Sequence, residues 1–254
     1  MAIKLVISGC CGRMGSRIAS LALGDSLFAI AGALEAKAHQ AIGQDLGTLL
    51  GSDVTGIRVT DDVKAALQGG QVLIEFTQPE ATVEHVRVAQ ELKKPMVIGT
   101  TGFSDAQRKI ISDAAKDIPI VLSPNMSVGV NLLFELVQMA AQRLGLRYDA
   151  EVVEAHHHTK KDAPSGTAKR LAELIASVRN QRAETIPVHS IRAGDIVGDH
   201  VVVFAGSSER LELVHRAHSR DVFAVGALRA AQFVAEARRP GLYEMRDVLQ
   251  TITT

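Results

Sequence analysis

Residues 1–15 read Met-Ala-Ile-Lys-Leu-Val-Ile-Ser-Gly-Cys-Cys-Gly-Arg-Met-Gly, an apolar run that leads into three glycines. Met1–Ser8 is almost continuously apolar, as in a strand that is buried on both faces. Apolar residues then recur at helical spacing from Ile18 to Ala22, which predicts a helix after the turn. A strand, a glycine-rich turn and a helix in this order open a dinucleotide-binding βαβ unit.

The glycines of the turn have separate roles in such a unit. Gly9 permits the tight turn, Gly12 lets a pyrophosphate approach the backbone, and Gly15 lets the helix pack closely on the strand. A second apolar run, Leu27–Leu34, ends at Glu35, where an acidic side chain is expected to accept hydrogen bonds from a ribose. The spacing Gly-x-x-Gly-x-x-Gly is a variant fingerprint, and a glycine-rich turn that binds nothing is the alternative.

The first half of the chain alternates strand-like and helix-like runs, which predicts a doubly wound, Rossmann-type parallel sheet. The further strands are expected at Val72–Phe76, Pro95–Ile98 and Ile118–Leu122, the helices at Ala81–Leu92 and Ser104–Lys116, and a loop at Ala36–Gly56. Ligands bind beyond the carboxyl ends of such strands. We therefore expect one cofactor cleft bordered by Gly9–Gly15, Thr77–Pro79, Gly99–Gly102 and Ser123–Met126.

The second half of the chain predicts a separate α+β domain with a mostly antiparallel sheet. Ser127 is expected to cap a helix at Val128–Leu144. Further strands are expected at Val188–Ala193, His200–Ala205 and Glu209–Ala217, and the tail is expected to be helical at Val222–Ala237 and Pro240–Leu249.

The segment Glu154–Thr167 carries the strongest chemical signal, with three histidines and two lysines before a predicted helix start. A short strand is expected before it, at Ala150–Ala155, and apolar residues at helical spacing follow it from Ala168 to Val178. Pro164 and Ser165 suit the first turn of that helix. The N–H groups of Ser165, Gly166 and Thr167 then point outward at the positive end of the helix dipole, a site for a carboxylate or phosphate.

Proton donors beside an anion site describe a catalytic pocket for an acidic substrate. Two alternatives stand beside this interpretation. The His triplet could bind a metal, but only His156 and His158 share one side of a strand, and no second Cys/His cluster completes a coordination shell, so we expect no metal. The triplet could also be a solvated strand end without function.

Composition favours a cytoplasmic enzyme of small molecules. The chain has 254 residues, with 28 Lys plus Arg against 28 Asp plus Glu, so no net charge draws it to nucleic acid or membrane. No apolar run is long enough to span a bilayer, and no secretory signal pattern is present. The two cysteines, Cys10 and Cys11, are adjacent and poorly placed for a disulfide, which indicates a reducing compartment and small side chains that fill a tight turn.

The chain resembles the dihydrodipicolinate reductase (4-hydroxy-tetrahydrodipicolinate reductase) family in the order of its motifs and in their residues. The resemblance rests on Gly-Cys-Cys-Gly-Arg-Met-Gly at 9–15, Val-Ile-Gly-Thr-Thr-Gly-Phe at 97–103, Asn-Met-Ser-Val-Gly-Val-Asn at 125–131, Glu-Ala-His-His-x-x-Lys-x-Asp-Ala-Pro-Ser-Gly-Thr-Ala at 154–168, Arg-Ala-Gly-Asp-Ile-Val-Gly at 192–198 and Met-Arg-Asp-Val-Leu at 245–249.

This resemblance implies a cytoplasmic homotetramer that reduces a cyclic imine dicarboxylate with NADH or NADPH in the diaminopimelate route to lysine. Hydride would reach C4 of the substrate as water is lost. Residues 1–126 and 220–254 would form the dinucleotide-binding domain, and residues 127–219 the substrate-binding and oligomerisation domain, with hinges near residues 126 and 220.

The resemblance also implies roles for individual residues. His156 corresponds to the proton donor, Lys160 to the catalytic lysine and His157 to a substrate contact. Whether Lys160 donates a proton or neutralises charge stays open. Gly166 and Thr167 correspond to the turn that holds a carboxylate, to which the helix-start argument adds Ser165. The implied cofactor contacts are Gly9, Cys10, Cys11, Gly12, Arg13, Met14, Glu35, Gly99, Thr100, Thr101, Ser123, Pro124, Asn125 and Met126.

The sequence departs from the family pattern after Glu35. Many members carry an arginine there that binds the 2′-phosphate of NADPH, whereas this chain has Ala36, with Lys37 and His39 nearby. NADH is therefore favoured, and dual use stays open. The segment from Asn180 to Arg192 is also shorter than in longer members. Two rival functions remain to be tested: a different nicotinamide dehydrogenase, and a nucleotide-sensing regulator without catalysis.

Overall fold

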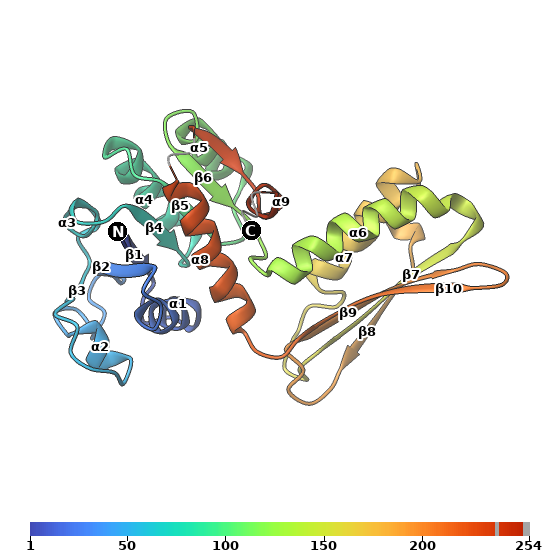
Figure 1. Ribbon diagram of the computed structural model, residues 1–254, viewed down its shortest axis with the longest axis horizontal. Coiled ribbons are helices and arrows are strands. Elements are labelled where there is room, and N and C mark those ends of the chain that lie inside the picture. Colours follow the sequence, from blue (N-terminus) through green and yellow to red (C-terminus); the bar gives the residue numbers. More distant parts are fainter. Residues whose placement is uncertain (237–238, 251–254) are drawn as a thin grey trace. The chain divides into compact units, whose positions relative to one another are not determined.

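The computed structural model describes residues 1–236 and 239–250. The chain divides into two compact units. The first unit joins Met1–Met126 to the segment that starts at Phe223, and the second is Ser127–Val222. Figure 1 labels the elements of both units. Among the described helices, none combines the length and apolar character needed to cross a bilayer.

The first unit contains a seven-stranded sheet in the order β11-β6-β5-β4-β1-β2-β3, and every pairing in it is parallel. Its strands are β1 (Ile3–Ser8), β2 (Phe28–Leu34), β3 (Val59–Thr60), β4 (Val72–Glu75), β5 (Met96–Ile98), β6 (Pro119–Leu122) and β11 (Gly241–Tyr243). Its helices are α1 (Arg13–Leu23), α2 (Leu46–Leu49), α3 (Val63–Gln68), α4 (Pro79–Glu91), α5 (Asp105–Ala114), α8 (Asp221–Ala235) and α9 (Met245–Leu249).

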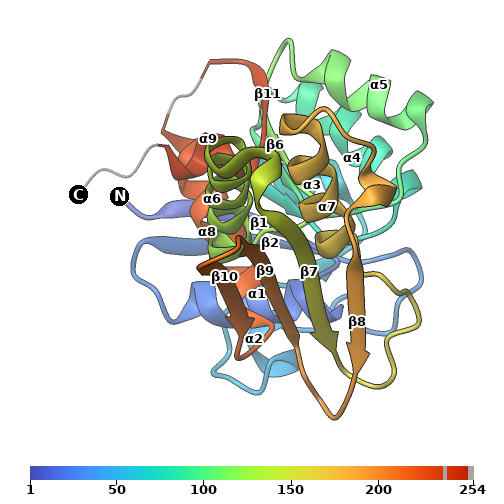
Figure 2. The ribbon, with the colours of Figure 1, turned by 90° about the vertical axis from the view of Figure 1, so that its right-hand side faces the viewer.

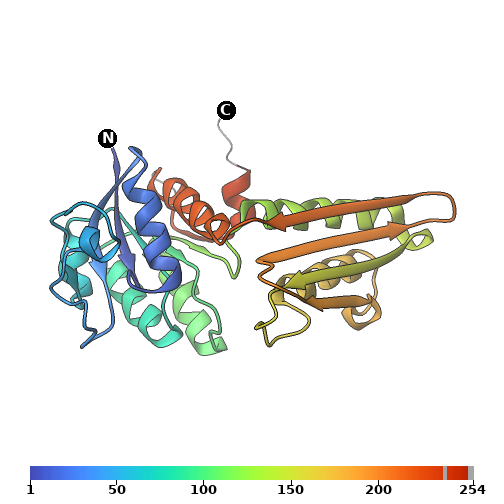
Figure 3. The ribbon, with the colours of Figure 1, turned by 90° about the horizontal axis from the view of Figure 1, so that it is seen from below.

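Helices cover both faces of this sheet. Helices α3, α4 and α5 contact one another along one face, where their apolar side chains share a core with those of β4, β5 and β6. Helices α1 and α8 lie on the other face (Figure 3). Side chains of both helices line a common groove. The strands β1 and β4 are buried along most of their length because both faces of the sheet are covered. The predicted doubly wound parallel sheet is confirmed.

The second unit contains a four-stranded sheet in the order β10-β9-β7-β8 (Figure 2). Its strands are β7 (Asp149–His156), β8 (Val188–Arg192), β9 (Gly198–Ala205) and β10 (Arg210–Ala217). Its helices are α6 (Val128–Leu144), α7 (Gly166–Val178) and two 3-10 turns, η1 (Gly145–Arg147) and η2 (Ala183–Thr185). Strand β9 pairs antiparallel with β7 and β10, whereas β8 runs parallel to β7. The expected mostly antiparallel sheet is confirmed.

Helices α6 and α7 cover only one face of the second sheet. Their apolar side chains form a core with Val152, Val202 and Phe204 from the strands. Both helices lie behind the strands in the view of Figure 3. Along β9, buried residues alternate with half-buried ones, as expected when helices of the same unit pack on one face and no described helix of that unit packs on the other.

Hydroxyl caps begin the two long helices of this unit. The Ser127 Oγ accepts the N–H of Val130 at the start of α6, as predicted. The Ser165 Oγ accepts the N–H of Ala168 at the start of α7. Ser165 is therefore the cap itself and Pro164 precedes it, so both lie one step earlier than the predicted first turn.

Two predictions of local structure are wrong in part. Pro240–Leu249 was expected to be helical, and Met245–Leu249 does form helix α9. Gly241–Tyr243, however, forms β11, which pairs parallel with β6 and extends the sheet. Three residues are too few to show the alternation that identifies a strand, and pairing with β6 decides their structure. The loop expected at Ala36–Gly56 contains the one-turn helix α2, capped by Asp45. Ala237 and residues 251–254 lie outside the described residues.

Candidate active site

The glycine turn after β1 is built to bring backbone close to backbone. Gly9 has a φ of 70°, a left-handed conformation that favours glycine. A Cβ on Gly15 would lie 2.1 Å from the Gly9 carbonyl oxygen, so only glycine allows α1 to pack this closely on the turn. Gly12 is the N-cap of α1 and no side chain caps that end of the helix. The start of α1 can therefore present its N–H groups to an anion.

Glu35 closes this turn from the end of β2. Its Oε2 accepts the N–H of Cys11 at 3.0 Å, and its Oε1 accepts the N–H of Ala36 at 2.9 Å. Glu35 and Cys11 are both half-buried. The structure thus brings Glu35 to the glycine turn, and a carboxylate held in this way has further lone pairs for a hydroxyl ligand.

The other expected segments lie at the same edge of the sheet because all its strands are parallel. The N–H of Gly99 donates to Glu75 O, and the N–H of Ser123 donates to Ile98 O. The Thr100 hydroxyl accepts the N–H of Thr77 at 3.0 Å. Of the remaining predicted cofactor contacts, Arg13, Thr101 and Pro124 are exposed, Met14 and Asn125 half-buried, and Met126 buried.

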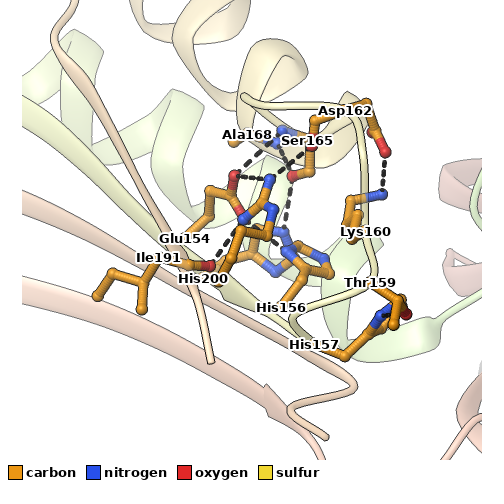
Figure 4. Close-up of polar contacts among 11 residues, drawn as sticks. Glu154, His156, His157, Thr159, Lys160, Asp162, Ser165, Ala168, Ile191 and His200 are labelled. Atoms are coloured by element: carbon orange, nitrogen blue, oxygen red, sulfur yellow. Dashed lines mark hydrogen bonds and ion pairs between the residues drawn. The ribbon is translucent and has the colours of Figure 1, made fainter. Parts of the chain in front are cut away.

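A buried carboxylate organises the polar centre of the second unit (Figure 4). Glu154 points from β7 towards the start of α7, and its side chain is fully buried. The guanidinium of Arg192 donates to both of its oxygens, at 3.0 Å and 2.8 Å. The N–H of Ser165 donates to it at 3.2 Å, and His156 Nδ1 makes a short contact with it. Burial raises the pKa of Glu154, but the side-chain hydrogen bonds of Arg192, Ser190 and His156 outweigh burial and lower it to about 2.

His156 is oriented by this carboxylate. Because Glu154 is ionised, Nδ1 of His156 carries the hydrogen that it donates, which leaves Nε2 to take or give a proton. The imidazole is only 10% exposed. Burial lowers the pKa of His156, and the opposing effect of Glu154 does not restore it to its ordinary value. His156 is therefore mostly neutral near pH 7 in the free protein.

Two further histidines extend from His156 across the sheet. The ring of His200 on β9 lies edge-on to that of His156, with centroids 5.3 Å apart, and His215 on β10 follows at 6.3 Å from His200. The Nε2 of His200 lies 3.4 Å from Ser165 Oγ. Burial, helped by the neighbouring histidines, lowers the pKa of His200 to about 3. His200 is thus a neutral packing and hydrogen-bonding partner at the cap of α7.

The basic residues of the motif lie around the start of α7. The Nζ of Lys160 pairs with Asp162 Oδ1 at 2.9 Å, and its side chain is 22% exposed. The Nδ1 of His157 contacts Thr159 Oγ1 at 2.7 Å, and His158 contacts the Gly194 carbonyl. A Cβ on Gly166 would meet nothing within 4 Å, so space is open beside the first residue of the helix. A cationic side chain, a helix start and open space can together receive a carboxylate.

Three residues of this centre had no assigned role in the sequence analysis. Glu154 shares a face of β7 with His156, a relation that i, i+2 spacing could have indicated. Arg192 pairs with His156 across β7 and β8, and His200 pairs with Glu154 across β7 and β9. These two partners depend on strand pairing, which a single sequence does not show.

Each half of the chain matches one part of a known family. The sequence pattern described as "Dihydrodipicolinate reductase, N-terminus" matches residues 3–126, and "Dihydrodipicolinate reductase, C-terminus" matches residues 129–249.

Curated relatives align over nearly the full length of the chain. A 4-hydroxy-tetrahydrodipicolinate reductase of Syntrophus aciditrophicus is 44% identical over 264 residues, which cover 97% of this chain and 98% of the relative. That of Aromatoleum aromaticum is 46% identical over 264 residues, covering 97% and 95%.

Solved structures share the fold. A dipicolinate-bound dihydrodipicolinate reductase from Paenisporosarcina sp. TG-14 superposes with a TM-score of 0.81 at 25% identity, covering 96% of this chain and 98% of that one. An amine dehydrogenase from Mycobacterium smegmatis superposes with a TM-score of 0.64 at 16% identity, covering 95% and 94%, which shows a common fold alone.

Proposed function

Since the chain belongs to the dihydrodipicolinate reductase family, we propose that this oxidoreductase converts 4-hydroxy-tetrahydrodipicolinate to tetrahydrodipicolinate with NADH or NADPH. The step belongs to the diaminopimelate route to lysine. The observation that carries the mechanism is the buried Glu154–His156 pair next to the start of α7. It offers an oriented proton carrier beside a place for a carboxylate.

The glycine turn fits a dinucleotide. The uncapped start of α1 offers N–H groups to a pyrophosphate, and Glu35 offers carboxylate lone pairs to the ribose. We assign the cofactor contacts to the glycine turn, Glu35 and the strand ends at Gly99–Thr101 and Ser123–Met126. A bound nicotinamide supplies a hydride, and the protein must supply the matching proton. With Ala36 after Glu35, we propose that NADH is preferred over NADPH.

The second unit is proposed to hold the dicarboxylate. The dihydrodipicolinate reductase from Paenisporosarcina is bound to dipicolinate, a planar diacid of the same class. In this chain, one carboxylate is assigned to the start of α7, at Ser165, Gly166 and Thr167, and His157 and Lys160 contact the substrate. Lys160 can exchange its Asp162 partner for the substrate, since both partners are carboxylates.

His156 is proposed to supply the proton at Nε2. Glu154 holds the ring by Nδ1 and stabilises the imidazolium that forms when Nε2 is protonated. In the free protein the pKa of His156 is lowered, mainly by burial. A bound dianion would raise that pKa, so the proton would be present only when there is a substrate to receive it.

Assembly and location follow from the second sheet and the cysteines. We propose a homotetramer built through the uncovered face of that sheet, where half-buried valines alternate along β9. Both cysteines are free thiols, which suits the reducing cytoplasm.

The test is a coupled assay with the cyclic product of pyruvate and aspartate semialdehyde. We expect cofactor oxidation by the parent protein. His156→Ala should lower kcat about 10²–10⁴-fold with little change in NADH affinity, whereas His218→Ala, at an exposed position just after β10, should leave kcat unchanged.

The rivals give different results in the same assay. Turnover of another acid without turnover of this one would identify a different nicotinamide dehydrogenase. NADH binding without turnover of any substrate in the parent protein would identify a sensor.

A further inference from the structure

The glycine turn of the first unit gathers three metal-ligating side chains. Cys10 and Cys11 place their sulfurs 3.9 Å apart, and a Glu35 carboxylate oxygen completes a group in which the ligand atoms lie within 4.8 Å of one another. Cys10 is buried, whereas Cys11 and Glu35 are half-buried. The group is therefore fixed on one side by the protein and open to an incoming ion on the other.

The spacing of the sulfurs suits a tetrahedral ion. Zinc–thiolate bonds of about 2.3 Å place two sulfurs of a tetrahedron about 3.8 Å apart. The observed 3.9 Å meets this requirement without movement of the turn. The carboxylate has to approach the sulfurs by roughly 1 Å, a shift that a glutamate side chain can make by rotation about its own bonds.

The chemistry of the ligand atoms selects the kind of ion. Two of the three side chains offer sulfur and one offers a carboxylate oxygen. Soft thiolate ligands favour zinc and related thiophilic ions. Hard cations such as Mg²⁺ prefer oxygen ligands.

We propose that Cys10, Cys11 and Glu35 form a site for a thiophilic dication of the zinc type, and that its occupation excludes the dinucleotide. When the ion binds, each thiol loses its proton to solvent and two metal–sulfur bonds form without a change in sulfur oxidation state. Glu35 supplies the third bond, and water can take the fourth position.

The exclusion follows from shared groups and rests on the proposed function of the turn. Glu35 is the carboxylate assigned to the ribose, and the N–H of Cys11 is one of its present partners. An ion that draws this carboxylate to the sulfurs removes it from the ribose. The ion would also fill the open side of the turn, which the cofactor needs for its approach.

The experiment titrates the reduced, metal-free protein with CdCl₂, because Cd²⁺ bound to thiolates gives an ultraviolet charge-transfer band. We expect the band to saturate at one equivalent, with release of two protons per ion. Cys10→Ser and Cys11→Ser should each abolish it. Glu35→Gln should weaken Cd²⁺ binding about tenfold or more, while Glu84→Gln, the same change at an exposed position on α4, should have no effect.

A second titration measures NADH affinity by fluorescence at increasing Cd²⁺. The proposal expects the apparent Kd for NADH to rise linearly with free Cd²⁺ in the parent protein. In Cys11→Ser, whatever the NADH affinity of the metal-free variant, Cd²⁺ should not change it. A charge-transfer band that survives both serine variants, or no band at all, overturns the metal site. A cysteine-dependent band with unchanged NADH affinity overturns the exclusion. Failure of the metal-free protein to bind NADH would instead count against the proposed function.

Discussion

At the scale of single residues, Glu154 decides what its neighbours can do. A carboxylate with no exposed side-chain surface would ordinarily be protonated, yet hydrogen bonds from the side chains of Arg192, Ser190 and His156 keep this one charged. The charge then fixes the tautomer of His156. A substitution at Glu154 should therefore lower activity through its effect on His156.

Glu154→Gln is predicted to lower kcat about 10²-fold or more, because an amide no longer fixes the imidazole tautomer or stabilises the imidazolium. KM should change less than kcat. Glu173→Gln is the matched control, since Glu173 lies on α7 of the same unit but is half-exposed and pairs with Arg170. Steady-state kinetics of both variants check the prediction. Equal losses in the two variants would contradict it.

The lowered pKa of His156 predicts a pH dependence. A proton donor is active in its protonated form, so kcat/KM should fall as pH rises through the pKa of the free protein, which lies below the ordinary 6.5. A bound dianion raises the pKa of His156, so kcat should keep its maximal value up to a higher pH than kcat/KM does. Separate pH profiles of the two parameters give the measurement. If kcat/KM fell only in the alkaline range, a group other than His156 would supply the proton.

At the scale of elements, helix α1 can pack closely on the glycine turn only because residue 15 has no side chain. Gly15→Ala would place a Cβ 2.1 Å from the Gly9 carbonyl and push the helix from the turn. We expect a loss of about 1–3 kcal/mol in the free energy of unfolding and weaker NADH binding.

Gly24→Ala is the control on the same helix, because its Cβ would meet only ordinary contacts at 3.6 Å and beyond. Urea unfolding and NADH titration compare the two variants. Equal NADH affinity in Gly15→Ala and the parent protein would argue against a cofactor role for the turn.

The buried histidine of β9 predicts acid lability in the second unit. The pKa of His200 is lowered to about 3 by burial first and neighbouring histidines second, against 6.5 in an unfolded chain. Between these values the unfolded state binds a proton that the folded state excludes. Stability is therefore present above pH 6.5 and lost as pH falls towards 3, by on the order of 4 kcal/mol.

His200→Asn should make Tm depend less on pH between 7 and 4. Asparagine does not titrate, so the unfolded state no longer gains a proton at this position. His218→Asn, at an exposed position, should leave the slope unchanged. Thermal unfolding followed by circular dichroism at several pH values provides the comparison. A parallel slope in His200→Asn and the parent protein would mean that other groups control acid unfolding.

The elements also show how far sequence alone leads. The helices α4, α5, α6 and α7 could be predicted because apolar spacing, and caps such as Ser104 and Ser127, are local signals. Strand β11 could not, because a three-residue strand is decided by its partner β6. The same limit applies at the site. His156 and Lys160 are neighbours in sequence, whereas Arg192 reaches Glu154 only through pairing of β7 with β8.

At the scale of the whole molecule, the uncovered face of the second sheet bears on assembly. Val201 on β9 pairs with Val214 on β10, and Ile191 on β8 is 48% exposed. Within the described residues of the second unit, no helix covers this face, and apolar side chains on such a face are typical of an interface between subunits.

Val201→Asp combined with Val214→Asp is therefore predicted to convert a tetramer to smaller species. Burying two charges in an apolar interface costs several kcal/mol per site, enough to shift the equilibrium at micromolar protein. Light scattering after size exclusion gives the mass. Val54→Asp, at a largely exposed valine of the first unit, is the control. A tetramer that persists in the double variant would place the interface elsewhere.

The pairing of β11, near the end of the chain, with β6 has a consequence for synthesis on the ribosome. Residues 119–122 leave the ribosome long before residues 241–243, the strand that lies beside them (Figure 1). During that interval the residues of the second unit, which are contiguous in sequence, leave the ribosome, while the edge of β6 that pairs with β11 stays unpaired. A nascent chain stalled before residue 241 should therefore be more prone to aggregate than the released protein, because unpaired strand edges recruit other strands.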